Sequence, residues 1–217
     1  MATQSPLMQR TDAPPRHFSL IRGFHLADFF TLGNAACGMA AIFLSMIYVG
    51  GQSLAHFYLA AAMAPAALVF DVLDGRIARW RNEHSALGRE LDSLADVISF
   101  GVAPAALAYA AGMRSGWDLV GLTYFVCCGV SRLARYNVTA ESMSGSSGKV
   151  AHFEGTPIPT TVLLTAVLAF AAWRGRVGDA LPWGAWTIGP WQLHPIALLF
   201  VASGTLMVSK TLRIPKL

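Results

Sequence analysis

The sequence is poor in charged residues and in cysteine. Asp, Glu, Lys and Arg make up 13% of the chain, against about 25% in an average soluble domain. With 54% hydrophobic residues, the chain cannot form a polar surface in water, which excludes an ordinary soluble protein. The three cysteines, Cys37, Cys127 and Cys128, lie inside apolar stretches. Their spacing is not that of a zinc site, so we expect buried, reduced thiols.

Apolar runs of membrane-spanning length fill most of the sequence. A spanning helix needs about 20 consecutive, mainly apolar residues. The candidates are residues 29–49, 54–70, 97–111, 119–138, 158–173 and 194–208. We therefore predict an all-α integral membrane bundle of six transmembrane helices. Residues 60–67 are nearly all alanine, which favours close packing between helices.

The N-terminal segment differs from the rest. Residues 1–16 are polar and contain a proline pair, so we expect a disordered tail. Residues 17–28 mix apolar and basic positions, a pattern typical of an amphipathic helix lying in the membrane interface. The membrane domain would then comprise residues 17–217.

The distribution of basic residues predicts the orientation. The net charge is +4, but the basic residues fall in clusters between apolar runs, so we expect no nucleic-acid partner. With six spans, thirteen Lys and Arg residues share a side with both termini, and three lie opposite. By the positive-inside rule, the termini should be cytoplasmic in the cell (inner) membrane. The thirteen are Arg10, Arg16, Arg22, Arg76, Arg79, Arg81, Arg89, Arg132, Arg135, Lys149, Lys210, Arg213 and Lys216, and the three are Arg114, Arg174 and Arg176.

Four aspartates stand at the edges of two neighbouring apolar segments. Asp71 and Asp74 are three residues apart, and Asp92 and Asp96 are four apart. Each spacing places both carboxylates on one face of a helix. A short turn near residues 80–88 would make the helices antiparallel and bring the four carboxylates together. Such a cluster needs cations between its members, and Mg²⁺ prefers oxygen ligands.

Other interpretations of the four aspartates are open at this point. They could be ordinary charges at the membrane edge, paired with Arg76, Arg79 and Arg89. They could also form the ion path of a metal-dependent transporter. An aspartyl intramembrane protease fits less well, because the GxGD segment typical of those enzymes is absent.

The spacing of eight residues in this stretch resembles a known signature. The pattern is Asp71-x-x-Asp74-Gly75-x-x-Ala78-Arg79, eight residues, then Gly88-x-x-x-Asp92-x-x-x-Asp96. It is similar at every fixed position to the signature of the CDP-alcohol phosphatidyltransferase family. Members of that family transfer a phosphatidyl group from a CDP-activated lipid to a small alcohol in the membrane.

The resemblance implies a role for each matching residue. Asp71 and Asp92 would bridge two Mg²⁺ or Mn²⁺ ions per active site, with Asp74 completing the first metal site and Asp96 the second. Asp96 would also be the base that removes the proton of the acceptor. The residues implied in binding the CDP-lipid are Asn34, Asp74, Gly75, Ala78, Arg79, Ser85 and Gly88. The family resemblance also implies a homodimer in contact with membrane lipids.

Three further segments bear on the acceptor. Residues 91–105, 131–138 and 153–161 resemble those of family members that use CDP-diacylglycerol and L-serine. Arg132, Arg135 and Asn137 lie at the predicted cytoplasmic end of a span, where they could bind the acceptor or, equally, anchor and cap the helix. Glycerol 3-phosphate, an inositol phosphate or choline are the alternative acceptors.

Overall fold

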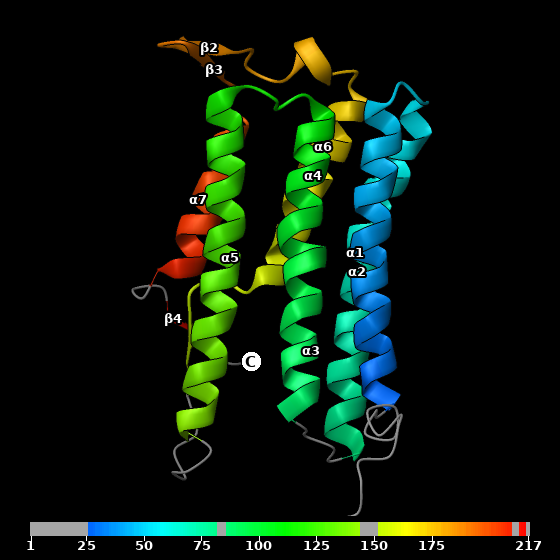
Figure 1. The fold of residues 1–217 in the computed structure, drawn as a ribbon, viewed down its shortest axis with the longest axis vertical. Helices are drawn as coiled ribbons and strands as arrows, with labels where there is room; N and C mark the ends of the chain where they lie inside the picture. Colours follow the sequence, from blue (N-terminus) through cyan, green and yellow to red (C-terminus); the bar gives the residue numbers. More distant parts are fainter. Residues whose placement is uncertain (1–25, 82–85, 144–151, 210–212, 216–217) are drawn as a thin grey trace, which may run out of the picture.

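The computed structural model describes residues 26–81, 86–143, 152–209 and 213–215. Long helices run alternately up and down in a bundle (Figure 1). The helices are α1 (Leu26–Val49), α2 (Leu54–Arg81), α3 (Ala86–Asp96), α4 (Ala103–Ala111), α5 (Gly116–Met143), α6 (Val162–Trp173) and α7 (Ala197–Val208). A π-helical segment, η2 (Val97–Val102), joins α3 to α4, and two 3₁₀ segments are η3 (Ile158–Thr161) and η4 (Gly178–Ala180).

Three of these described helical stretches are long and apolar enough to cross a membrane. They are Leu26–Val49, Leu54–Arg81 and Leu87–Ala111, and the last combines α3, η2 and α4. Ile158–Trp173 and Ala197–Val208 are shorter apolar helices. The all-α membrane fold is therefore confirmed, while the count of six spans stays a prediction.

Helix α1 is organised for a lipid environment. Its buried face is a stripe of small or polar residues at intervals of three and four, which includes Thr31, Asn34, Gly38, Ala41 and Ser45. Large apolar side chains cover the outer face: Phe29, Phe43 and Met46 are 61%, 53% and 63% exposed. Because lipid tails are as apolar as these side chains, nothing drives them inward, and the small residues allow close contact between helices.

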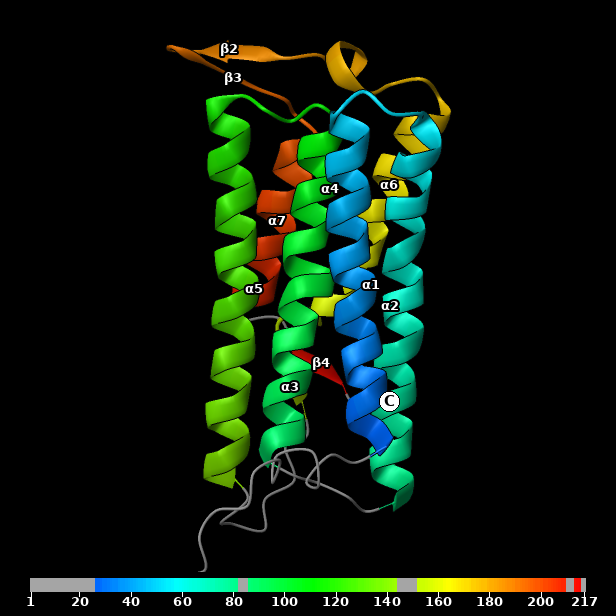
Figure 2. The same cartoon turned by 45° about the vertical axis from the view of Figure 1, so that its right-hand side comes forward.

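Helix α2 packs along α1 over its length, as both cartoon views show (Figure 2). Ala60, Ala61, Ala64 and Ala67 are buried, which confirms that the alanine run packs between helices. Pro65 stands inside α2, which remains continuous from Leu54 to Arg81.

Several element boundaries differ from the sequence prediction. Helix α5 is longer than the predicted 119–138, and α7 begins at Ala197, three residues after His194. Residues 17–25 of the predicted interfacial helix and the tail 1–16 lie outside the described residues, whereas residues 26–28 form the first turn of α1. The thiols were predicted too uniformly: Cys128 is buried, but Cys127 is exposed on the bundle surface, where an apolar thiol can face lipid.

Two short strand pairs were not predicted from the sequence. Strand β1 (His152–Glu154) pairs with β4 (Arg213–Pro215), and β2 (Trp186–Ile188) pairs with β3 (Trp191–Leu193). The hairpin β2–β3 lies across one end of the bundle, which we call the hairpin end (Figure 1). Trp173, Trp183, Trp186 and Trp191 are all exposed, as expected of interfacial anchors.

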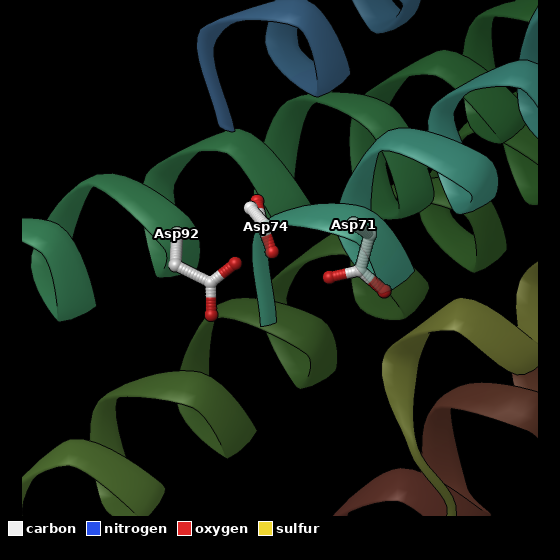
Figure 3. Close-up of side chains that lie close together, drawn as sticks. All are labelled: Asp71, Asp74 and Asp92. Atoms are coloured by element: carbon white, nitrogen blue, oxygen red, sulfur yellow. The ribbon is translucent and has the colours of Figure 1, made fainter. Parts of the chain in front are cut away.

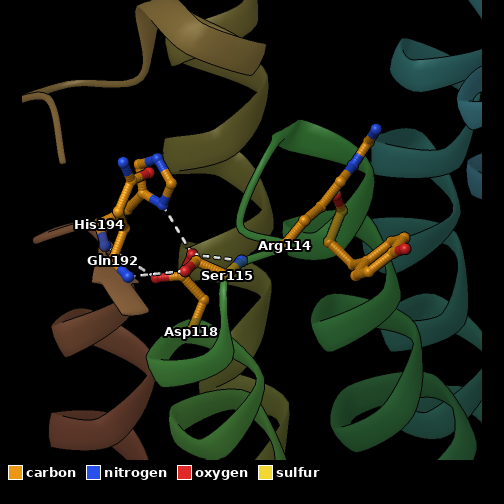
Figure 4. Close-up of polar contacts among 6 residues, drawn as sticks. Arg114, Ser115, Asp118, Gln192 and His194 are labelled. Atoms are coloured by element: carbon orange, nitrogen blue, oxygen red, sulfur yellow. Dashed lines mark hydrogen bonds and ion pairs between the residues drawn. The ribbon is translucent and has the colours of Figure 1, made fainter. Parts of the chain in front are cut away.

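A buried polar cluster connects helices at the hairpin end (Figure 4). Asp118 in the first turn of α5 is fully buried, and its carboxylate accepts from the Ser115 backbone N–H at 3.1 Å and the His194 backbone N–H at 2.8 Å. His194 Nδ1 lies 2.6 Å from the same carboxylate. Asp118 thereby caps α5 and holds the segment that leads into α7.

Candidate active site

Three aspartates converge between α2 and α3, at the end of the bundle opposite the hairpin (Figure 3). Asp71 and Asp74 lie one turn apart on α2, and Asp92 lies on α3. Each offers a carboxylate oxygen, and the three oxygens lie within 4.8 Å of one another. The convergence follows from the antiparallel course of α2, which ends at Arg81, and α3, which begins at Ala86.

In the part of the chain that the structure describes, no arginine pairs with the three carboxylates. Among the described residues, no salt bridge joins Asp71, Asp74 or Asp92 to a basic side chain. Asp92 Oδ1 is buried and has no hydrogen-bond partner in that part of the chain. An unpaired buried carboxylate oxygen is costly. Three carboxylates that each offer an oxygen, one of them unpartnered, fit a hard divalent cation.

Asp96 lies outside this group of three and is held separately. Its Oδ1 accepts a hydrogen bond from Asn34 Nδ2 on α1 at 3.1 Å. Asp96 is 7% exposed and Asn34 is fully buried. Asn34, predicted to contact the nucleotide, is therefore also the partner of the proposed base. Its own Oδ1 is buried and has no partner in the described residues.

The sequence interpretation missed Thr31. Its hydroxyl donates to Asp74 Oδ2 at 2.8 Å, with the Ala27 carbonyl at 3.2 Å, and Thr31 is 3% exposed. Thr31 and Asn34 are three residues apart on the small-residue stripe of α1. This spacing in an otherwise apolar run was the signal that could have identified both as partners of the aspartates. Asp28, also unpredicted, is 3% exposed near the start of the same helix.

The residues assigned to the nucleotide lie around the end of α2. A Cβ atom placed on Gly75 would meet nothing within 4 Å, so open space borders the helix there. Arg79 is exposed, and its Nε donates to the Gly75 carbonyl at 2.9 Å. Ala78 is half-buried and Gly88 lies in the first turn of α3. Ser85 lies outside the described residues.

The structure separates the two arginines assigned to the acceptor. Arg132 Nε is buried without a hydrogen-bond partner among the described residues. Arg135 Nη1 instead approaches the Val208 carbonyl at the end of α7, at 3.4 Å. Of the two, Arg132 is therefore the one with a buried N–H group that has no partner in the described part of the chain.

Asn137 connects α5 to α3. Its Nδ2 donates to Ser93 Oγ at 3.0 Å and lies 3.3 Å from both carboxylate oxygens of Glu90. Asn137 is 9% exposed, and Ser93 Oγ also lies 3.2 Å from Asn137 Oδ1. The partners Glu90 and Ser93 could not be predicted, because they lie in a segment of the chain distant from Asn137.

The chain belongs to the CDP-alcohol phosphatidyltransferase family, whose family model matches residues 24–191. The match includes α1 and the whole aspartate signature. The membrane fold and the acidic group between α2 and α3 agree with this class of protein. The family is generally metal-dependent, and Asp71, Asp74 and Asp92 are a group that could bind metal.

Three relatives narrow the comparison. The chain is 41% identical over 217 residues to a CDP-diacylglycerol–serine O-phosphatidyltransferase of Saccharomyces cerevisiae, which covers 96% of this chain and 77% of the relative. It is 39% identical over 145 residues to the protein of the same name in Helicobacter pylori, a match that covers 64% of this chain and 55% of the relative. The Bacillus subtilis protein of that name is 36% identical over 149 residues, a match that covers 67% of this chain and 76% of the relative.

Proposed function

We propose that this protein transfers the phosphatidyl group of CDP-diacylglycerol to L-serine, giving phosphatidylserine and CMP. The observation that carries the proposal is the convergence of Asp71, Asp74 and Asp92 in a chain 41% identical to an enzyme named for this reaction. A donor with a diphosphate suits the site, because cations held by three carboxylates can also bind phosphate oxygens.

The four aspartates hold two Mg²⁺ or Mn²⁺ ions in this proposal. Asp71 and Asp92 would hold both ions, with Asp74 at the first metal site and Asp96 at the second. The unpartnered Oδ1 of Asp92 supports this assignment. When bound, the ions stabilise the negative charge on the attacked phosphate and on the leaving CMP.

The donor lies along the ends of α2 and α3. The open space beside Gly75 admits the flat cytosine base, with Ala78 and Gly88 leaving room on either side. Arg79 pairs with phosphate oxygens through its planar guanidinium, and Ser85 contributes a hydroxyl. Asn34 faces the nucleotide with its free Oδ1 while its Nδ2 stays bonded to Asp96.

Asp96 acts as the base for the acceptor. The serine hydroxyl is a poor nucleophile until it loses its proton, which Asp96 accepts. The serine oxygen forms a bond to the β-phosphorus, and the bond from that phosphorus to the oxygen of CMP breaks. No covalent phosphatidyl-enzyme is needed, so the reaction is sequential and inverts the configuration at phosphorus.

Arg132 binds the serine carboxylate in this proposal. Its buried Nε, which has no partner among the described residues, supports that role, because the serine carboxylate can accept a hydrogen bond from it. Arg135 is the weaker candidate, since it is directed to the end of α7. Asn137 contributes by holding α5 against α3 next to the acceptor.

The enzyme works as a homodimer in the cell (inner) membrane, with both termini and the active site cytoplasmic. The excess of basic residues at the aspartate end supports the orientation. Chemical crosslinking in native membranes tests the dimer.

An acceptor screen tests the proposed function. Purified protein, radiolabelled CDP-diacylglycerol and Mn²⁺ are incubated with L-serine, glycerol 3-phosphate, an inositol phosphate or choline. We expect a labelled phosphatidyl product and CMP with L-serine. Product from another acceptor alone would refute serine as the acceptor but not the proposed role of the aspartates. The absence of CMP with every acceptor would refute the proposed enzymatic activity.

A further inference from the structure

The helix that carries Asp96 changes its geometry directly after that residue. Residues Val97–Val102 form a π-helix, and the N–H of Ala103 donates to the Ile98 carbonyl five residues back. A π-turn accommodates an extra residue in the helix and occurs often at functional sites. It sets the direction in which Asp96 points relative to α4, because it separates the two α-helical stretches.

Pro104 explains why one carbonyl of this turn needs an outside donor. In a regular α-helix, the Phe100 carbonyl would accept from the N–H of residue 104, but proline has none. The hydroxyl of Thr161, on η3, donates to the Phe100 carbonyl at 2.8 Å. Thr161 is fully buried. The π-turn is thus held from the η3 side by a side chain remote in sequence.

Helix α1 holds the turn from the other side. Ser99 Oγ donates to the Asn34 carbonyl at 2.8 Å, and a Cβ on Gly38 would lie 2.7 Å from Ser99 Cα. Only glycine permits this approach. The same Asn34 donates through its side chain to Asp96. Ser99 therefore contacts Asn34, the residue that donates to Asp96, and Ser99 itself lies three residues after Asp96 in the chain.

We infer that Ser99 and Thr161 are positioning residues for Asp96: they hold the π-turn from two sides and so direct the carboxylate at its start. The inference rests on the proposed role of Asp96 as the base. Neither hydroxyl is itself a proposed ligand of the metal or the donor, so their loss should act through Asp96 and Asn34 and lower kcat more than it weakens donor binding.

The chain offers a matched control for each residue. Ser45 is also buried on α1 and donates to a backbone carbonyl, that of Ala41, at 2.8 Å. Thr165 is 3% exposed and donates to the Val162 carbonyl at 2.8 Å. Ser45→Ala and Thr165→Val thus remove the same groups without removing a hydrogen bond to the π-turn or to Asn34, and Thr165→Val does so beside the cavity that Ser99 also lines.

The experiment compares Ser99→Ala and Thr161→Val with these controls in the purified full-length enzyme. We expect kcat with L-serine to fall between about 10-fold and 100-fold, the scale of a small misalignment of reacting groups. The KM for CDP-diacylglycerol and the calorimetric Kd for CDP with Mn²⁺ should each change by a smaller factor than kcat. The controls should keep the wild-type kcat, and their thermal midpoints in detergent show whether the loss of a buried hydroxyl alone affects folding.

The outcomes separate this inference from the proposed function. If Asp96→Asn has normal turnover, the base assignment fails. If Asp96→Asn is inactive while Ser99→Ala and Thr161→Val match their controls, the positioning inference fails alone. If one of these variants does not fold, the other still tests whether its own hydrogen bond to this region affects kcat. In an Asp96→Asn background, Ser99→Ala should lower the residual turnover no further.

Discussion

At the scale of single residues, the site depends on carboxylates whose charge the described part of the protein does not neutralise. Asp71, Asp74 and Asp92 bring three oxygens within 4.8 Å. Their identity was readable from the sequence, because helical spacing alone puts each pair on one face. The hydrogen bonds from Thr31 to Asp74 and from Asn34 to Asp96 could not be predicted from the sequence, because they depend on how α1 lies against α2 and α3.

We expect Asp71→Asn and Asp92→Asn to abolish phosphatidyl transfer, because each removes a negative ligand from the group. Turnover should need Mg²⁺ or Mn²⁺. Binding of Mn²⁺, measured by electron paramagnetic resonance, should weaken in both variants. Asp179→Asn, an exposed carboxylate at the hairpin end, is the control. Full activity in excess chelator would contradict the two-metal proposal.

We expect Asp96→Asn to lower kcat by about a hundredfold or more, the usual contribution of a positioned base. Donor binding should survive better, because Asp71, Asp74 and Asp92 remain. The measurement is single-turnover product formation alongside equilibrium binding of CDP. Near-normal turnover would mean that another group accepts the proton.

Arg132→Ala should raise the KM for serine by about tenfold or more, since hydrogen bonds to charged groups contribute about 1.5–3 kcal/mol. The KM for the lipid donor should change less. Arg135→Ala is the matched control, because this arginine is directed to the Val208 carbonyl. Equal effects of the two substitutions on the KM for serine would refute the distinction drawn from the structure.

At the scale of elements, the hydrophobic runs predicted the helices and missed what joins them. The range 158–173 corresponds to η3 and α6, and 29–49 lies within α1. The π-turn could not be predicted from the sequence. It is associated with Pro104, the hydrogen bond from Thr161 and the close approach of Ser99 to Gly38, which come from separate parts of the chain. The strand pairs were also hidden: β1 and β4 are three residues each and far apart in sequence.

Helices α5 and α7 depend on one buried carboxylate at the hairpin end. Asp118→Asn leaves a side chain with one acceptor atom where three N–H groups now converge. We expect the free energy of unfolding to fall by about 1–3 kcal/mol, the cost of leaving a buried donor without its acceptor. The thermal midpoint in detergent should fall by several degrees. The exposed Asp179→Asn should leave it unchanged, and an unaltered midpoint in Asp118→Asn would show that the cluster is dispensable.

At the scale of the whole molecule, the two ends of the bundle differ in composition. Described arginines at the aspartate end are Arg76, Arg79, Arg81, Arg89, Arg132 and Arg135, whereas Arg114, Arg174 and Arg176 lie toward the hairpin end. Charge counting predicted this asymmetry, because it needs only the order of the spans. Interhelical contacts cannot be predicted by the same means, since lipid-facing and buried positions are both apolar.

The proposed orientation has a direct test in membrane vesicles. In a variant without its native cysteines, we expect Arg81→Cys to react with a membrane-impermeant maleimide only when the cytoplasmic face is accessible. Asp179→Cys should react only from the opposite face. The reverse labelling pattern would invert the topology while leaving the site geometry unchanged.

The aspartates and the proposed acceptor arginine come from different stretches of the chain. Helices α1 to α3 supply Thr31, Asn34 and all four aspartates, whereas α5 supplies Arg132. In the proposed function, the residues that activate the alcohol would therefore lie before residue 97, and those that select it largely after residue 115. Such a division would let a lineage exchange one alcohol for another by altering α5, without rebuilding the proposed metal-binding carboxylates. A single ancestral bundle could in this way give rise to the headgroup diversity of a membrane.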